Sequence, residues 1–133
     1  MAQFPSAAHL CSWAGLSPGN NESAGKRKSG KTRKGNEKLR TALVEAARAA
    51  ARTKNTYLSA QYHRIAACRG RNRAAVAVAH TILTIIYHML SRRQPYIELG
   101  PTYYEECQKD AVMKQAIREL QSLGMEVTVK PVA

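Results

Sequence analysis

A serine followed by a dense basic run is the part of this chain whose residue types could do chemistry. Ser23 lies in a glycine-punctuated stretch, and between Lys26 and Arg40 there are eight Lys or Arg residues against one acid, Glu37. A serine that attacks a phosphodiester needs an activated hydroxyl and stabilisation of the charge that develops at the phosphate. The clustered cations can supply the second requirement, and nothing nearby in the sequence supplies the first. From spacing alone, an ordinary turn serine is the competing interpretation.

The basic run is itself a candidate binding surface. It cannot bury itself, because desolvating so many unpaired charges costs too much free energy, whereas each Lys or Arg that neutralises a phosphate releases counterions. A solvated tail is the ordinary interpretation of such a run, but helical patterns follow this one and favour nucleic acid. At the helix start, Asn36 is either a phosphate contact or a plain cap. The candidate nucleic-acid-binding residues are Lys26, Arg27, Lys28, Lys31, Arg33, Lys34, Asn36 and Arg40.

The charge of the chain is strongly localised. Residues 26–73 hold 15 Lys or Arg and two acids, a net of +13, while the rest of the 133 residues carry a net of −1. This footprint is typical of a nucleic-acid binder, and it does not distinguish DNA from RNA. Without an apolar run of about 18 residues, we expect no transmembrane helix and no membrane partner. The three widely separated cysteines form neither a disulfide framework nor a CxxC metal site, which fits a reducing cytoplasm.

The elements that must position these residues are predicted to be mainly α-helical. We expect a small domain of four to five helices, with the apolar residues Ile82, Leu83 and Ile86 at its centre. A glycine-rich basic loop over residues 15–35 would separate the first helix from the second. The predicted elements are a short helix from Ser6 to Gly15, helices at Asn36–Arg52, Thr56–Ala67, Arg73–Leu90 (capped by Asn72) and Tyr103–Leu123, and one short edge strand at Glu126–Lys130.

Three spaced motifs resemble a known family. They are the lead-in F-x-S-x-x-x-L-x-x-W-A-G-L-x-P at Phe4–Pro18, S-x-G-K at Ser23–Lys26 and K-G-N-x-x-L-R at Lys34–Arg40. Together with the later GRNRAAVAVAHTILTIIYHML, they resemble the C-terminal transposase domain of the insertion-sequence-110 family over about residues 4–92. These are the DEDD-type, bridge-RNA-guided serine recombinases of bacterial mobile elements. The resemblance places a transposase domain at 1–92, and a helix and strand at 93–133 packed on it or peripheral.

The resemblance implies that Ser23 is the nucleophile that forms a phosphoserine link to DNA. In the family this serine works beside four acidic residues and magnesium on a separate N-terminal RNase-H-like domain. This chain has nine acids and only one Asp, Asp110, so we expect no metal site in it. Because the lead-in begins just after Met1, we expect a truncated transposase whose isolated chain is inactive. Magnesium is then expected on the missing domain, with no cofactor in this chain.

Two function classes remain open at this point. One is a transposase domain with a competent serine loop, which acts when a carboxylate-bearing partner domain completes the site in trans. The other is a noncatalytic nucleic-acid-binding remnant that uses the same basic surface. The ordered motifs disfavour a ribosome-associated basic protein. The expected partners are DNA, a guide RNA and further copies of the full-length protein, in the cytoplasm of a bacterium and associated with its nucleoid.

Overall fold

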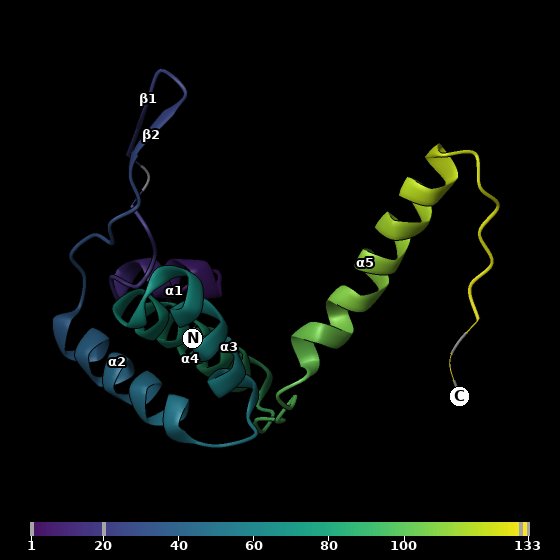
Figure 1. Cartoon of the computed structure of the whole chain (residues 1–133). Helices are drawn as coiled ribbons and strands as arrows, with labels where there is room; N and C mark the ends of the chain where they lie inside the picture. The colour runs from purple at the N-terminus through teal and green to yellow at the C-terminus, as the bar shows by residue number, and fades with distance from the viewer. Residues whose placement is uncertain (1, 20, 131, 133) are drawn as a thin grey trace. The chain divides into compact units, whose positions relative to one another are not determined.

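The computed structural model describes residues 2–19, 21–130 and 132, with the backbone alone for Asn21 and Arg27. Its elements are α1 (Ala7–Trp13), β1 (Asn21–Ser23), β2 (Lys26–Ser29), α2 (Glu37–Arg52), α3 (Tyr57–Arg69), α4 (Arg71–Arg92) and α5 (Tyr103–Ser122) (Figure 1). The mainly α fold expected from the sequence is confirmed. By packing, the chain forms two compact units, Met1–Pro101 and Thr102–Ala133, which are described separately. The functional boundary expected after residue 92 stays a prediction.

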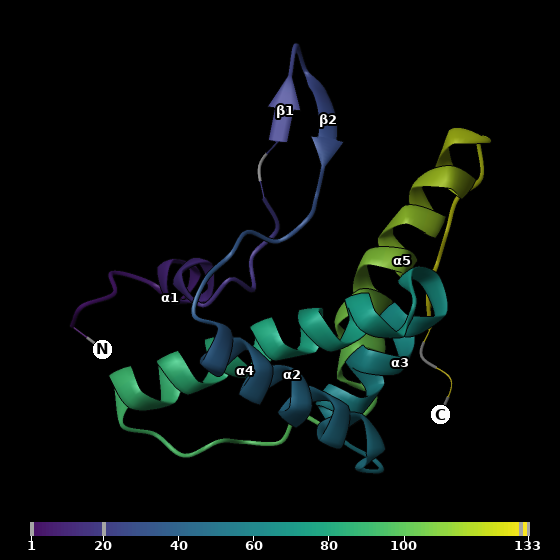
Figure 2. The same cartoon turned by 90° about the vertical axis from the view of Figure 1, so that its left-hand side faces the viewer.

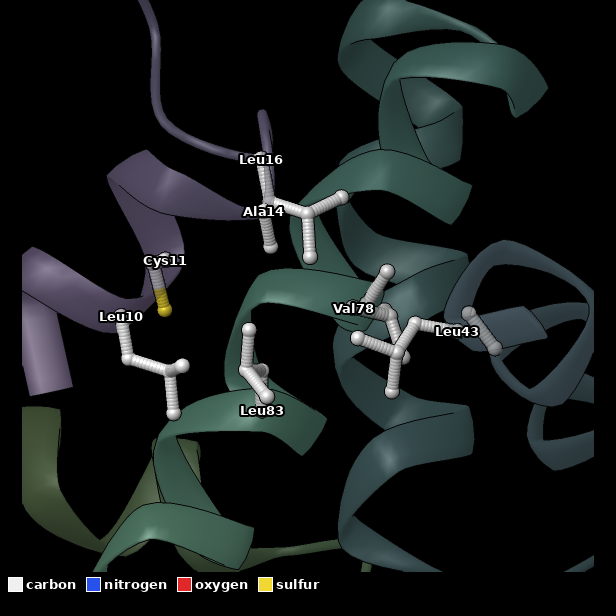
Figure 3. Close-up of a cluster of buried hydrophobic side chains, with 9 residues drawn as sticks. Leu10, Cys11, Ala14, Leu16, Leu43, Val78 and Leu83 are labelled. Atoms are coloured by element: carbon white, nitrogen blue, oxygen red, sulfur yellow. The ribbon is translucent and has the colours of Figure 1, made fainter. Parts of the chain in front are cut away.

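The core of the first unit is built around α4. Helices α1, α2 and α3 all pack against it, and Figure 3 shows side chains from α1, α2 and α4 pointing toward one another. Leu83 is buried as predicted, while Ile82 and Ile86 are half-buried at the edge of the cluster. Small side chains let the helices approach closely. The buried residues of this cluster are Leu10, Cys11, Ala14, Leu16, Leu43, Ala47, Val78, Ala79 and Leu83.

Helix α4 is long and apolar enough to cross a membrane by length and composition alone. Five of its residues are buried in this unit, and three other helices cover it. A core helix has the same composition as a membrane span of this length, because both must bury apolar surface. This unit buries 28% of the most apolar stretch of α4, so packing accounts for part of its apolar character.

The starts of α2 and α4 show how far local signals determine the helices. The Asn36 side chain accepts a hydrogen bond from the Leu39 amide at 3.0 Å, so the predicted cap of α2 is confirmed. The predicted cap of α4 is wrong, because Asn72 lies inside its first turn. Gly70, at φ +89°, separates α4 from α3 and takes the cap position itself. Glycine adopts this backbone conformation at little cost, whereas side chains disfavour it.

The second unit contains α5, none of whose residues is buried within that unit. The helix ends at Ser122; Gly124, which follows it, has φ +81°, and the Met125 amide donates to the Leu120 carbonyl at 3.3 Å. The strand predicted at Glu126–Lys130 is wrong, because these residues are irregular. A strand needs a neighbour to satisfy its amides and carbonyls, and the strands of the described chain, β1 and β2, pair with each other.

Candidate nucleic-acid interface and serine hairpin

The basic stretch is a β-hairpin over residues 21–29, so the expectation of a loop is wrong there. Strands β1 and β2 are antiparallel, with Ser23 opposite Lys26 and Glu22 opposite Arg27. The two residues between the strands, Ala24 and Gly25, have φ values of +52° and +75°. Two consecutive positive φ angles are what a tight type I′ hairpin turn requires.

The root of the hairpin is a close crossing of two backbone segments. A Cβ added to Gly35 would lie 2.5 Å from the Ala14 carbonyl carbon and 2.6 Å from the Trp13 carbonyl oxygen. The Asn36 amide donates to that Trp13 oxygen at 3.2 Å, which joins the end of the segment that carries the hairpin to the end of α1. Only glycine fits at residue 35, because the space of a side chain is already filled by backbone.

Two further contacts fix the start of the segment that carries the hairpin. At the end of α1, Gly15 has φ +76°, and the Leu16 amide donates to the Cys11 carbonyl at 3.0 Å. This is a Schellman arrangement, in which the residue after the glycine folds back onto the helix, and Leu16 is accordingly buried. Farther up, the Gly19 amide donates to the Lys31 carbonyl at 2.9 Å. The hairpin is thus joined to the core at its foot, and its tip stands away from the helices of the first unit (Figure 2).

Ser23 is exposed beside the turn and shares one face of the hairpin with Lys26. Directly paired residues project from the same face of a sheet with Cβ atoms about 4.5–5.5 Å apart, so Lys26 flanks Ser23. The register shifts beyond this pair and leaves Lys28 without a partner on β1, so the regular alternation of faces along β2 does not extend to Lys28. Glu22 is paired with Arg27 and belongs to the opposite face. The nearest acid in sequence is therefore directed away from the serine.

The residue after the serine holds an unfavourable backbone conformation. Ala24 is at φ +52°, a region that costs a residue with a Cβ about 1–2 kcal/mol. The hairpin register leaves it no alternative, because both turn residues must be left-handed. Backbone strain of this kind tends to occur at functional positions. The strained residue here is the neighbour of the one hydroxyl group at the tip of the described hairpin.

The other sequence-predicted residues are spread along the hairpin and the segment that follows. Lys26, Lys28, Lys31, Arg33 and Lys34 are exposed, and Arg40 is half-buried in the first turn of α2. The oxygen of the Asn36 side chain is engaged in the helix cap. The backbone of Arg27 lies in β2, and its side chain falls outside the described part of the structure. The structure therefore places the exposed lysines and arginines along one continuous protrusion.

A cavity of about 930 Å³ lies at the foot of the hairpin. It includes two arginines that the sequence analysis did not select, Arg69 at the end of α3 and Arg73 in the first turn of α4. Only the turn sequence CRGRNR marks these residues, and nothing in it indicates proximity to Lys28. The lining residues are Leu16, Pro18, Lys28, Ser29, Gly30, Lys31, Thr32, Arg69, Asn72, Arg73, Val76 and Ala77.

A second cavity, of about 480 Å³, lies between α4 and the segment that follows it. Glu98 holds this segment, because its Oε1 accepts hydrogen bonds from the Tyr57 amide at 2.6 Å and the Gly100 amide at 3.0 Å. The bond from Tyr57 is the main reason that the pKa of Glu98 is lowered. His80 also lines this cavity, and burial lowers its pKa. The lining is mostly apolar and offers no basic cluster comparable to that of the hairpin.

Metal-ligating side chains do not gather in the described residues. No three His, Cys, Asp or Glu lie close enough to hold an ion there. Around Ser23, the carboxylate of Glu22 is single and belongs to the other face. Magnesium at a phosphoryl-transfer site is usually bound by one or two carboxylates together with the substrate phosphates, so a carboxylate must lie on the same face as the serine. The residues of the hairpin therefore do not fit a resident magnesium ion.

Comparison with known proteins bears on the part of the chain that includes the hairpin. Residues 1–64 match the family described as Transposase IS116/IS110/IS902 family. No curated protein and no solved structure matches the chain. The matched segment contains α1, the glycine crossing, the hairpin with Ser23, α2 and the first part of α3. This match covers just under half of the chain and supports a transposase domain of the C-terminal type in residues 1–64.

Proposed function

We propose that this chain is the DNA-binding, serine-bearing part of a transposase, in which Ser23 is the nucleophile for strand cleavage and exchange. The observation that supports this most directly is the placement of Ser23. It is exposed beside a strained turn and directly opposite Lys26, at the tip of a basic hairpin. A phosphate that approached the hydroxyl would meet the Lys26 ammonium at the same face.

The chemistry is a transesterification at phosphorus. The Ser23 Oγ attacks the phosphate, a new Oγ–P bond forms, and the P–O bond to one strand end breaks. The hydroxyl proton passes to a general base, and the released strand end takes up a proton as it leaves with its oxygen. Lys26 stabilises the charge on the phosphate oxygens as the transition state forms. Reversal of the reaction with a different strand end joins DNA and frees the serine.

The general base must come from outside the hairpin. Glu22, the neighbouring acid, belongs to the opposite face, and an unactivated serine hydroxyl is a weak nucleophile. The proposed partner is a carboxylate-bearing RNase-H-like transposase domain supplied in trans, which carries magnesium, together with a guide RNA. On this proposal the isolated chain does not cut DNA. It acts in homo-oligomers of the complete protein at the bacterial nucleoid, in the cytoplasm.

A second function is supported by the same geometry. In the described residues around Ser23, no side chain is placed to take its proton, which favours a noncatalytic nucleic-acid-binding remnant of a transposase. Both functions use the basic face, and they differ only in whether the serine reacts. An intact acidic domain encoded beside this chain would favour the catalytic alternative.

Covalent adduct formation tests the catalytic proposal. The chain is combined with the acidic domain, its RNA and end-labelled DNA, and protein–DNA adducts are resolved on a denaturing gel. Ser23→Ala should abolish the adducts while salt-sensitive DNA binding stays nearly intact, because one hydroxyl adds little beside many cations. Ser12→Ala, an exposed serine on α1, is the matched control and should form adducts normally. Adducts that persist in Ser23→Ala would place the nucleophile elsewhere.

A further inference from the structure

The cavity at the foot of the hairpin brings together cations from two distant parts of the sequence. Lys28 and Lys31 come from the hairpin and its return segment, whereas Arg69 and Arg73 flank the junction of α3 and α4. The fold places these four side chains around one hollow. Their mutual repulsion is a cost that a bound anion would relieve.

None of the four cations is paired with an acidic side chain of the described residues. For Arg69 and Arg73, as for both lysines, the described residues supply no hydrogen bond or ion pair to the side chain. All four are exposed at the rim. At the same junction, α4 begins at Arg71 with Gly70 as its N-cap, and it has no side-chain cap and no acid in its first turn. The rim therefore presents positive charge that nothing in the described chain neutralises.

The interior of the cavity differs from its rim. The lining includes Leu16, which is buried, and Val76 and Ala77, which are half-buried. A volume of about 930 Å³ is at the upper end of the range of small-ligand sites, so it exceeds the need of a single small anion. A duplex presents phosphates on its outside and keeps its bases stacked, so it has little to place in such a hollow. A single strand can turn a sugar or an unstacked base inward while its phosphates remain at the rim.

We infer that this cavity is a binding site for a single-stranded segment of nucleic acid, with Lys28, Lys31, Arg69 and Arg73 contacting its phosphates. The inference rests on the proposed nucleic-acid role of the hairpin and adds to it a site and a strand type. The lining contains no aromatic side chain on which a base could stack. The site therefore holds the strand by its backbone and discriminates little between bases.

The position of the cavity relative to Ser23 indicates how the two sites could act on the same strand. Lys28 lines the cavity, and Lys26 precedes it by two residues on β2, or about 7 Å. Lys26 is the residue opposite Ser23. A nucleic-acid strand that runs along β2 from the cavity reaches the serine within a few nucleotides. The cavity would thus hold the strand whose phosphate is presented at the hairpin tip.

Fluorescence anisotropy with a labelled single strand and the matching duplex tests the inference on the full chain. The single strand should bind more tightly than the duplex of the same sequence. Arg69→Ala with Arg73→Ala should flatten the plot of log affinity against log salt by about 1.4 units, because each lost phosphate contact on a single strand accounts for about 0.7. Lys109→Ala with Lys114→Ala, on α5, removes the same charge from exposed residues and should leave the slope nearly unchanged.

Three results would overturn the inference. They are equal binding of strand and duplex, an equal change of slope in the two double variants, and displacement of the strand by inorganic phosphate or a mononucleotide at matched phosphate concentration. The last would make the cavity a simple anion site. Circular dichroism checks that the Arg69/Arg73 variant is folded, and Lys31→Ala provides a second route to the same site. Covalent adducts at Ser23 are measured in a separate experiment. A failure of the cavity proposal therefore does not contradict the serine proposal, and a failure of the serine proposal does not contradict the cavity proposal.

Discussion

The hairpin and the helical core of the first unit obtain their structure in different ways. The core is held by buried apolar side chains from α1, α2 and α4. The hairpin buries none of its described side chains between residues 22 and 29 and depends on a tight turn, a short ladder and a glycine crossing at its foot. The difference teaches that candidate chemistry can be carried by a segment with no core of its own, provided that its root is fixed.

This separation has a physical logic. A phosphate-binding surface must remain hydrated and positively charged until its partner arrives, which is incompatible with burial. Rigidity must then come from backbone geometry, because side chains cannot provide it. Gly15, Gly19 and Gly35 allow the backbone contacts that supply this rigidity at the foot. Toward the tip we expect low local stability, as in segments with few apolar contacts.

The largest effect on folding is expected from a cavity in the core. Leu83→Ala removes a buried side chain from the centre of α4 and should destabilise the unit by about 2–5 kcal/mol. Leu90→Ala changes the same residue type on the same helix, but Leu90 is 58% exposed, and the variant should lose well under about 1 kcal/mol. Urea unfolding followed by circular dichroism measures both. Similar losses for the two leucines would contradict the packing described for α4.

A smaller effect is expected at the root of the hairpin. Gly35→Ala forces a methyl group into backbone and should cost about 1–3 kcal/mol, the usual range for overpacking. Gly25→Ala at the turn meets no atom within 4 Å, and its cost of about 1 kcal/mol comes only from φ +75°. Urea unfolding compares their stabilities, and hydrogen exchange of the hairpin amides reports whether the root has opened. If Gly25→Ala were the more damaging variant, the turn and not the crossing would fix the hairpin.

The smallest effect is a pH dependence that comes from His80, a half-buried residue of α4. Burial lowers the pKa of His80 below its ordinary value, so the folded chain binds this proton less readily than the unfolded chain. The stability is therefore present above the unfolded pKa of about 6.5 and is lost as the pH falls through the folded pKa. His80→Gln should weaken the loss of thermal stability between neutral and mildly acidic pH. His63→Gln, at an exposed position on α3, is the control and should leave it unchanged.

The sequence predicts the helices well where a local signal decides them. Asn36 predicts the start of α2, because its side chain accepts a hydrogen bond from a free amide of the first turn and needs no tertiary contact to do so. The start of α4 is harder to predict, because Gly70 and Asn72 both suit a helix N-cap and only the backbone geometry distinguishes them. Alternation at Glu126–Lys130 looked like a strand, but alternation cannot supply the partner that a strand requires.

The candidate site was only partly predictable. The motif around Ser23 marks a serine beside cations, but charge and glycine also describe an irregular loop. The hairpin was missed because Ala24-Gly25 is not among the preferred type I′ turn pairs. The pairing of Ser23 with Lys26 follows only once the register is known. Arg69 and Arg73 are far from Lys28 in sequence, and tertiary packing alone brings them to the same cavity.

The contact between α1 and α4 also determines which cysteines of this protein are oxidised first. The Cys11 thiol is buried there, with its Sγ 3.7 Å from the His80 carbonyl oxygen and 3.6 Å from the Thr84 hydroxyl. Burial raises its pKa, which keeps the unreactive thiol form, whereas Cys68 and Cys107 are exposed. Peroxide or an alkylating reagent would reach those two first. Modification of Cys11 would then record how often α1 lifts away from the rest of the domain.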